Sequence, residues 1–241
     1  MAIFLRSVRN RQIYTMSIKT NIELLNGELS AKGARLVAVS KTYPVELIRE
    51  AYQAGHRIFG ENRVQELVPK FEELPKDIAW HLIGHLQTNK VKYIAPFVSL
   101  IHSVDSLKLL QEINKQGQKI GRVIPCLLQV YIAKEETKFG WDRDELLAAV
   151  TQKGFDEFAF VKIDGLMGVA SLTDNTAQIH AEMQALEDLF LLLKTMPLPP
   201  NMEMKELSLG MSSDYRIALQ HGTTLVRIGT TIFGNRNYQK A

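Results

Sequence analysis

The chain has 241 residues, of which 46% are hydrophobic, and its formal net charge is +3. This length is enough for one large domain or two small ones, and no apolar stretch approaches the roughly 20 residues that span a bilayer. Removing the three arginines of the first fifteen residues leaves 26 basic against 26 acidic residues, and such a balance excludes a strong nucleic-acid or membrane footprint.

The first fifteen residues are basic, since they contain Arg6, Arg9 and Arg11 and no acid. Their apolar run is too short for a secretory signal. An organelle-targeting peptide, a disordered extension and an upstream start codon are all compatible with this composition, and we favour the last two, with Met16 beginning the compact protein. We therefore expect a disordered extension over residues 1–15 and one folded domain over 16–241.

Eight apolar runs rich in β-branched residues follow in chain order. They span residues 35–41, 57–61, 78–84, 99–105, 123–132, 158–168, 205–211 and 224–230. Continuous apolar runs are typical of parallel strands that are buried on both faces. Helical segments separate the runs, and strand followed by helix, eight times over, predicts the α/β class and a single (β/α)₈ TIM barrel.

The segments between the runs contain residues that begin or end helices. These are Pro44 with Gly55, Asp105, Asp142 with Glu145 and Gly154, and Ser213 with Gly222. Residues 17–33 precede the first run and have room for a helix, which we expect to cover the barrel wall. Residues 195–205 are a proline-rich linker before the seventh run.

The active site of such a barrel lies at the C-terminal ends of its strands, so polar residues at those ends are candidates. They are Lys41, Asn62, His85, Asp105, Gly168, Ser212 and Thr230, with His81 and Arg227 slightly deeper in their strands. Lys41 matters most, because burial can hold a lysine amine neutral and only the neutral amine attacks a carbonyl.

The last two runs end in "GMSSD" and "VRIGT". Phosphate sites in these barrels form from the loops after strands 7 and 8 and a helix N-terminus. We expect Ser212 and Ser213 to open a helix, Gly229 to let the backbone approach a ligand, and Thr230 to donate from its hydroxyl. A lysine facing this site predicts a phosphorylated aldehyde held as a Schiff base, with pyridoxal phosphate as the leading candidate.

Eight motifs extend this interpretation to nearly the whole chain, from about residue 17 to 234. They are "LVAVSKTYP", "FGENRVQEL", "WHLIGHLQTNK", "IHSVDS", "KFGW", "GLMG", "LSLGMSSDY" and "LVRIGTTIFG". In this order they resemble the YggS/PROSC family of pyridoxal-phosphate-binding proteins. The resemblance implies a barrel of the alanine racemase N-terminal type, and a role in intracellular pyridoxal phosphate homeostasis with little or no catalysis.

The resemblance also implies a set of cofactor-binding residues, while no catalytic residue is assigned. Lys41 would hold pyridoxal 5'-phosphate as a Schiff base, Ser212, Gly229 and Thr230 would hold its phosphate, Arg227 would approach the pyridine nitrogen, and Asn62 and His81 would lie near the cofactor. The implied partners are the cofactor and the apo-forms of enzymes that depend on it. We expect a cytoplasmic monomer, and the lone Cys126 in an apolar run fits a reducing compartment.

The alternative function is that of an amino-acid racemase, because alanine racemases share the lysine on the first strand. Those enzymes also need a tyrosine from a C-terminal β domain, which we expect to be absent here. Tyr43 and Tyr215 remain as internal acids or bases. Arg227 argues against transaminase-type chemistry, since a guanidinium donates to a ring nitrogen but cannot accept its proton.

Three further interpretations of the sequence involve a metal site, a nucleic-acid patch and a phosphosugar barrel. His81 and His85 are four residues apart, which is the spacing of metal-binding histidines on a helix. The sequence of this segment predicts a strand and a loop instead, so we expect no metal site there. The basic segment that begins at Gln87 reads as a solvated helix face rather than a nucleic-acid patch. A generic phosphosugar barrel is the third, and it would not need Lys41.

Overall fold

The computed structural model describes residues 17–133, 139–152 and 154–234, so the predicted extension over 1–15 lies outside the described residues. Within them, eight parallel strands close into a barrel in sequential order, which confirms the predicted (β/α)₈ architecture. The strands are β1 (Arg35–Val39), β2 (Ile58–Glu61), β3 (Ala79–Leu82), β4 (Leu100–Val104), β5 (Ile124–Gln129), β6 (Val161–Met167), β7 (Met202–Met211) and β8 (Leu225–Ile228).

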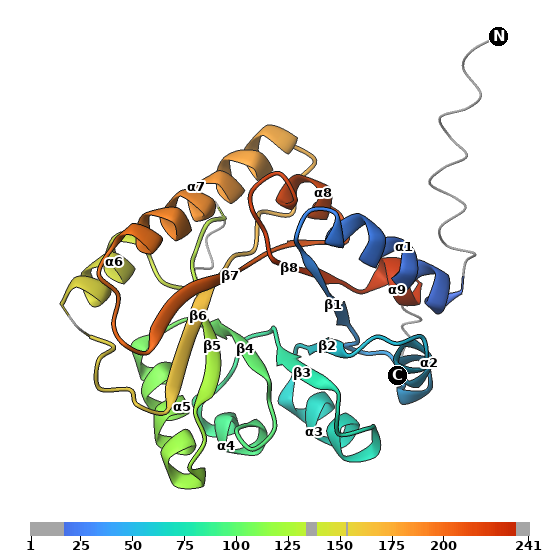
Figure 1. The fold of residues 1–241 in the computed structure, drawn as a ribbon, viewed down its shortest axis with the longest axis horizontal. Coiled ribbons are helices and arrows are strands. Elements are labelled where there is room, and N and C mark those ends of the chain that lie inside the picture. The colour runs from blue at the N-terminus through green and yellow to red at the C-terminus, as the bar shows by residue number, and fades with distance from the viewer. Residues whose placement is uncertain (1–16, 134–138, 153, 235–241) are drawn as a thin grey trace.

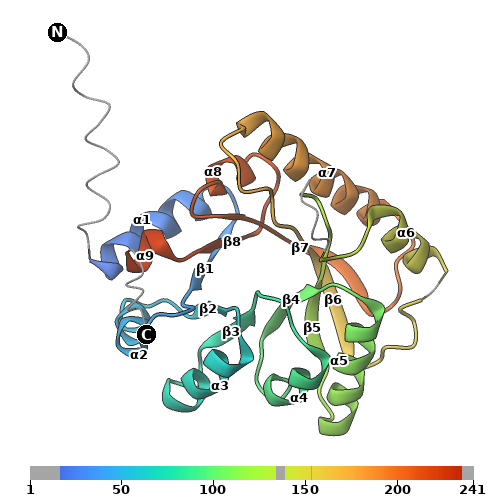
Figure 2. The same cartoon turned by 180° about the vertical axis from the view of Figure 1, so that it is seen from behind.

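Helices form a ring outside the strands (Figure 1), and the reverse view shows the same ring (Figure 2). They are α1 (Ile18–Ser30), α2 (Val45–Gln53), α3 (Val64–Glu73), α4 (Val91–Ile94) after the short η2 (Thr88–Lys90), α5 (Leu107–Ile120), α6 (Arg143–Thr151), α7 (Thr176–Thr195), α8 (Tyr215–Ala218) and α9 (Thr230–Phe233). Across the described ranges, we find no helix with the length and apolar character needed to cross a membrane.

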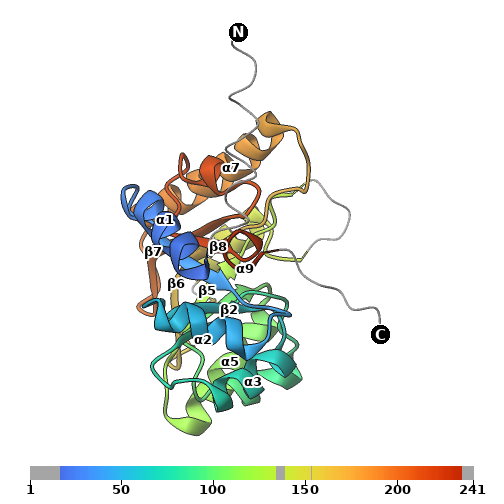
Figure 3. The ribbon, with the colours of Figure 1, turned by 90° about the vertical axis from the view of Figure 1, so that its right-hand side faces the viewer.

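The leading helix α1 covers the wall of the barrel beside β1, as the sequence predicts, and it lies next to α9 (Figure 3). It begins after Ser17, whose side chain accepts a hydrogen bond from the Thr20 amide. Its buried residues recur with helical spacing and face the strands. The Asn21 amide donates to the Ile232 carbonyl at 3.1 Å. The short final helix and the leading helix therefore close the ring together.

Several predicted boundaries are wrong by a few residues. Ser106 rather than Asp105 caps α5, since its side chain accepts from the Leu109 amide. The prediction that Asp142 begins a helix is confirmed, since it caps α6. That helix ends at Thr151, before the predicted Gly154. Strand β7 begins at Met202, inside the segment predicted as a linker. Local capping signals compete within one or two residues, and tertiary packing decides between them.

The barrel interior has an apolar layer, and a polar layer lies nearer the mouth. The apolar layer is a buried cluster of Val37, Leu100, Leu127, Met167 and Leu225. Because side chains alternate along a strand, Arg227 faces the same interior as Leu225, two residues closer to the C-terminal end of β8. The polar layer borders the candidate site.

Candidate functional site

Six of the seven residues predicted to bind a cofactor line one cavity at the ends of β1, β2, β7 and β8. The cavity has a volume of about 470 Å³. The six are Lys41, Asn62, Ser212, Arg227, Gly229 and Thr230, and Val39, Ile83, Val169, Met211 and Ser213 complete the lining. Four separate strands therefore bring the predicted groups together at the mouth of the barrel.

The loops after β7 and β8 meet at one side of this cavity. The Gly229 amide donates to Ser212 Oγ at 3.4 Å, which joins the two loops. Within the described part of the chain, the backbone N–H groups of Ser213, Thr230 and Thr231 have no hydrogen-bond partner. Unpaired N–H groups beside a cavity suit an anion, because each can donate to one of its oxygens.

Ser213 does not cap the helix after β7, contrary to the prediction. Asp214 occupies the N-cap of α8, and its carboxylate accepts from the Met211 amide at 2.6 Å. The helix itself has only four residues. The three polar residues from Ser212 to Asp214 all suit a cap, and only the fold decides which one turns inward. Ser213 is thereby left exposed at the cavity rim.

Gly229 packs so closely against β1 that a side chain would not fit there. A Cβ atom on Gly229 would lie 2.9 Å from the Val39 carbonyl oxygen. Strand Cβ atoms essentially never come so close to backbone atoms, so a side chain here would push β8 away from β1. Gly229 lines the cavity, and this packing on Val39 is a reason for a glycine that the sequence did not predict.

A buried ion pair holds the residue before Lys41. Lys70 Nζ lies 2.7 Å from Glu61 Oε1 and donates to the Ser40 carbonyl at 2.8 Å. Ser40 Oγ donates to the same carboxylate oxygen at 2.6 Å. Glu61 is fully buried, and this burial raises its pKa, while the Lys70 charge acts in the opposite direction. The backbone just before Lys41 is therefore fixed by charged groups beneath it.

The residue after Lys41 is held by the same cluster. The Thr42 amide donates to Glu66 Oε2 at 2.7 Å, and Glu66 lies 3.7 Å from Lys70. Among the described residues other than glycine, Thr42 alone has a positive φ, of 66°. That conformation is unfavourable for a β-branched residue and persists where surrounding contacts determine it. Lys41 thus stands between two anchored residues, on a sharp turn at the cavity edge.

Asn62 reaches the cavity from the end of β2, and a glycine on the next loop sets its position. A Cβ atom on Gly84 would lie 2.5 Å from the Asn62 carbonyl oxygen and 2.9 Å from Asn62 Cβ. The loop after β3 therefore packs directly on Asn62. No larger residue fits at Gly84 without moving the asparagine.

Arg227 lies almost fully buried between β6 and β7, with part of its side chain lining the cavity. Its Nη1 donates to the Ser208 carbonyl at 2.9 Å and to Ser208 Oγ at 2.6 Å, and its Nη2 donates to the Gly168 carbonyl at 2.8 Å. Burial lowers its pKa to about 10, with Asp214 acting in the opposite direction. The guanidinium stays protonated at neutral pH, so it can only donate.

A hydrogen-bonded chain leads from Arg227 across the barrel interior. His102 Nδ1 lies 2.9 Å from Ser208 Oγ, and His81 Nδ1 lies 2.9 Å from His102 Nε2. Burial lowers the pKa of His81 to about 3 and that of His102 well below its usual value, so both rings are neutral at pH 7. His81, which was predicted to lie near the cofactor, reaches the cavity only through this chain.

One arrangement of the protons pairs each donor along the chain from Arg227 to His81 Nδ1. Arg227 donates to Ser208 Oγ, so the hydroxyl proton goes to His102 Nδ1. The proton of His102 then lies on Nε2 and is donated to His81 Nδ1, and the proton of His81 lies on Nε2. The reverse arrangement leaves the buried hydroxyl proton without an acceptor, which costs free energy.

Ser208→Ala breaks this chain and tests it. We expect a loss of about 1–3 kcal/mol in the free energy of unfolding, because the buried His102 Nδ1 loses its donor while Arg227 keeps its two carbonyl acceptors. Urea unfolding at neutral pH measures the loss. Ser30→Ala, at an exposed helix end, is the matched control, and an equal effect of the two substitutions would contradict the chain.

The other histidine of the four-residue spacing has a different partner. His85 Nδ1 lies 3.0 Å from Asp105 Oδ2, and the His85 ring lies 5.1 Å from the ring of Phe139. His85 and Asp105 stand at the barrel mouth but do not line the cavity. His81 and His85 thus contact separate residues.

Sequence reasoning missed the groups that support the site. Glu61 and Lys70 position the turn at Lys41, and His102 and Ser208 hold Arg227. A signal was present, because His102 and Ser208 are polar residues at inward-facing positions inside apolar strands. A polar residue at such a position needs a partner across the barrel.

Comparison with known proteins adds to this geometry. The family described as "Alanine racemase, N-terminal domain" matches residues 13–237. A pyridoxal phosphate homeostasis protein of Aquifex aeolicus is 40% identical over 209 residues, which cover 85% of this chain and 88% of the relative.

Two solved structures of PipY from Synechococcus elongatus resemble the chain along most of its length. The structure without PLP gives a TM-score of 0.84 at 38% identity and covers 90% of this chain and 100% of PipY. The structure with PLP bound gives a TM-score of 0.80 at 36% identity, with the same coverage.

Proposed function

We propose that this chain binds pyridoxal 5'-phosphate reversibly and takes part in its homeostasis. It belongs to the alanine racemase N-terminal domain family and, within that family, to the pyridoxal phosphate homeostasis proteins. One observation carries the proposal: a lysine and an arginine line one cavity together with Ser213 and Thr230, whose backbone N–H groups are unpaired, and these residues come from three strands. The cavity volume of about 470 Å³ is within the range of small-ligand sites.

The residues of the cavity fit the chemical groups of this cofactor. Bound pyridoxal phosphate would supply an aldehyde that reacts with an amine. Lys41 would provide that amine and hold the aldehyde carbon as a Schiff base. Ser212, Gly229 and Thr230 would hold the phosphate at the loops after β7 and β8, where free N–H groups lie.

Arg227 and Asn62 would complete the binding of the ring. Arg227 can only donate, so it would hydrogen-bond a ring nitrogen that carries no proton, which makes the ring a weak electron sink. Asn62 lines the cavity from β2, beside the loop that contains Gly84. This arrangement favours holding the cofactor over turning over substrate.

A titration tests the proposed function. We expect wild-type protein dialysed against pyridoxal phosphate to become yellow, and Lys41→Ala to bind at least tenfold more weakly, about 1.4 kcal/mol, without the yellow colour. Residual binding through the β7 and β8 loops should weaken further when Ser212→Ala and Thr230→Val are added, because the two hydroxyl donors are lost while the backbone N–H groups remain. Lys108→Ala, on the exposed face of α5, is the control. A colourless wild type, or a Lys41→Ala variant of unchanged affinity, would contradict the proposal.

A racemase would need a second catalytic base, and neither of the two tyrosines suggested by the sequence is placed to act as one. The Tyr43 hydroxyl donates to the Gly234 carbonyl at 2.6 Å, and the Tyr215 hydroxyl donates to Glu28 Oε2 at 2.9 Å. Burial and this hydrogen bond raise the pKa of Tyr215 to about 12. Neither residue lines the cavity. A racemisation rate above that of free cofactor would restore the alternative.

We also propose that the protein acts as a monomeric domain over residues 16–241 in the cytoplasm and passes the cofactor to apo-enzymes that need it. The open mouth of the barrel supports transfer, since it leaves the site accessible. Light scattering tests the oligomeric state. Recovery of activity in an apo-enzyme dialysed against the loaded protein, compared with an equal concentration of free cofactor, tests the transfer.

A further inference from the structure

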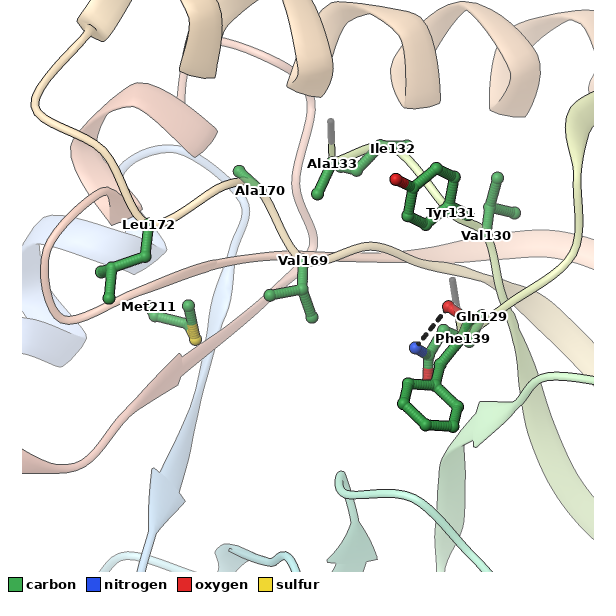
Figure 4. Close-up of a pocket in the computed structure, with 10 residues that line it drawn as sticks. All are labelled: Gln129, Val130, Tyr131, Ile132, Ala133, Phe139, Val169, Ala170, Leu172 and Met211. Carbon is green, nitrogen blue, oxygen red and sulfur yellow. Dashed lines mark hydrogen bonds between the residues drawn. The ribbon is translucent and has the colours of Figure 1, made fainter. Parts of the chain in front are cut away.

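A second cavity adjoins the first at the barrel mouth. It has a volume of about 390 Å³ and lies at the ends of β5, β6 and β7 (Figure 4). Val169 and Met211 line both cavities. A ligand group attached to the cofactor site can therefore extend into the second cavity past these two side chains.

The lining of the second cavity is mainly hydrocarbon. Besides the two shared residues it consists of Gln129, Val130, Tyr131, Ile132, Ala133, Phe139, Ala170 and Leu172. Leu172 is 88% exposed and Phe139 56% exposed. Exposed apolar side chains that gather beside a cavity mark binding sites, because burying them on a ligand is favourable.

Phe139 is held at the rim by a defined contact. The Gln129 side-chain amide donates to the Phe139 carbonyl at 3.1 Å, as Figure 4 shows. The Phe139 ring also lies beside that of His85. Phe139 is thus held at the rim by Gln129 at the end of β5 and by His85 in the loop after β3.

The described residues that line the second cavity offer no partner for a charged ligand group. Of the described residues that line it, none is a lysine, arginine, histidine, aspartate or glutamate. A carboxylate or phosphate would gain no ion pair from these described residues. A hydrocarbon group would gain free energy from burial, roughly 0.8 kcal/mol per methylene.

We propose that this second cavity is a subsite for the hydrocarbon chain of a primary amine whose nitrogen lies beside Lys41. The inference rests on the proposed function, since an amine is the group that can take the place of Lys41 at the aldehyde carbon. In that exchange the aldehyde carbon would form a double bond to the incoming nitrogen as its double bond to Lys41 Nζ breaks. The two hydrogens of the incoming nitrogen pass to Lys41, and nothing is oxidised or reduced. The favoured ligands are amines with a hydrocarbon chain.

The first test examines the second cavity without the cofactor. Methyl resonances of the cofactor-free protein are followed during titration with n-butanol, n-pentanol and n-hexanol, which resemble the amines but form no Schiff base. We expect shifts at Val169, Leu172 and Met211 and an affinity that rises about fourfold per methylene. Leu172→Asp should weaken binding at least threefold, whereas Leu191→Asp, on the exposed face of α7, should not.

The second test uses protein loaded with pyridoxal phosphate and n-alkylamines from ethylamine to hexylamine. The amount of cofactor that borohydride fixes to Lys41 is measured by mass spectrometry. We expect the amine concentration that halves this label to fall about fourfold per methylene, and to fall less steeply in Leu172→Asp. The same amines with free cofactor give the baseline.

The outcomes separate the two proposals. A flat amine series, or identical behaviour of Leu172→Asp and Leu191→Asp, in protein that retains the cofactor would overturn the subsite and leave the proposed function intact. A protein that never fixes the cofactor to Lys41 would overturn both, whatever the alcohols do.

Discussion

Lys70→Met should lower the free energy of unfolding by about 3–5 kcal/mol at pH 7, because it leaves a buried carboxylate without its counter-charge. Lys70 Nζ lies 2.7 Å from Glu61 Oε1, and Glu61 is fully buried. After the substitution only Ser40 Oγ donates to that carboxylate, and the Ser40 carbonyl also loses its donor. Urea unfolding measures the loss.

The pH dependence of this loss has a definite sign. Burial already raises the pKa of Glu61, and removing Lys70 raises it further. A carboxyl with a raised pKa in the folded state contributes stability at low pH that is lost as pH rises through that pKa. The deficit of Lys70→Met should therefore shrink as the pH is lowered and Glu61 takes up a proton.

Two further variants complete this test. Glu61→Gln combined with Lys70→Met should recover much of the loss, since no buried charge remains. Lys19→Met, on the exposed face of α1, should change stability by less than about 0.5 kcal/mol. A deficit in Lys70→Met no larger than that of Lys19→Met would show that the ion pair does not anchor the turn at Lys41.

Acid should destabilise the protein through the buried histidine pair. The pKa of His81 is lowered to about 3 in the folded state, against an ordinary value of 6.5. A base with a lowered pKa contributes stability that is present above pH 6.5 and lost as pH falls towards 3. At 1.36 kcal/mol per unit, we expect His81 to contribute a loss of about 3 kcal/mol between pH 7 and pH 4.

The comparison with His81→Gln isolates this contribution, because glutamine does not titrate. Other groups also respond to acid: the lowered pKa of His56 acts in the same direction, and the raised pKa values of Glu61 and Asp214 act in the opposite one. These groups are common to both proteins and cancel in the difference. Parallel stability curves for wild type and His81→Gln from pH 7 to 4 would contradict the burial of a neutral His81.

The site residues that were predicted from the sequence share a simple geometric origin. Lys41 and Thr230 end apolar runs and Asn62 directly follows one, and parallel strands of a closed barrel bring all such ends to one mouth. The strand pattern therefore sufficed to gather them. It did not reveal which loop residues turn inward, so Ser213 was assigned the cap that Asp214 occupies.

The groups that hold the site in place depend on contacts between distant strands. His102 and Ser208 are 106 positions apart and meet only because the barrel closes. Lys70 was predicted only as part of a helix, yet it reaches under the turn at Lys41. Such pairs follow from side-chain packing across the fold, which the spacing of one sequence does not encode.

The central claim is that Lys41 holds the aldehyde of pyridoxal phosphate, and peptide mapping after borohydride reduction tests it most directly. The full chain is loaded with the cofactor, reduced, digested and analysed by mass spectrometry. We predict one modified peptide, with the mass of the reduced phosphopyridoxyl group on Lys41. A label on another lysine, or no fixed label under saturating cofactor, would contradict the account.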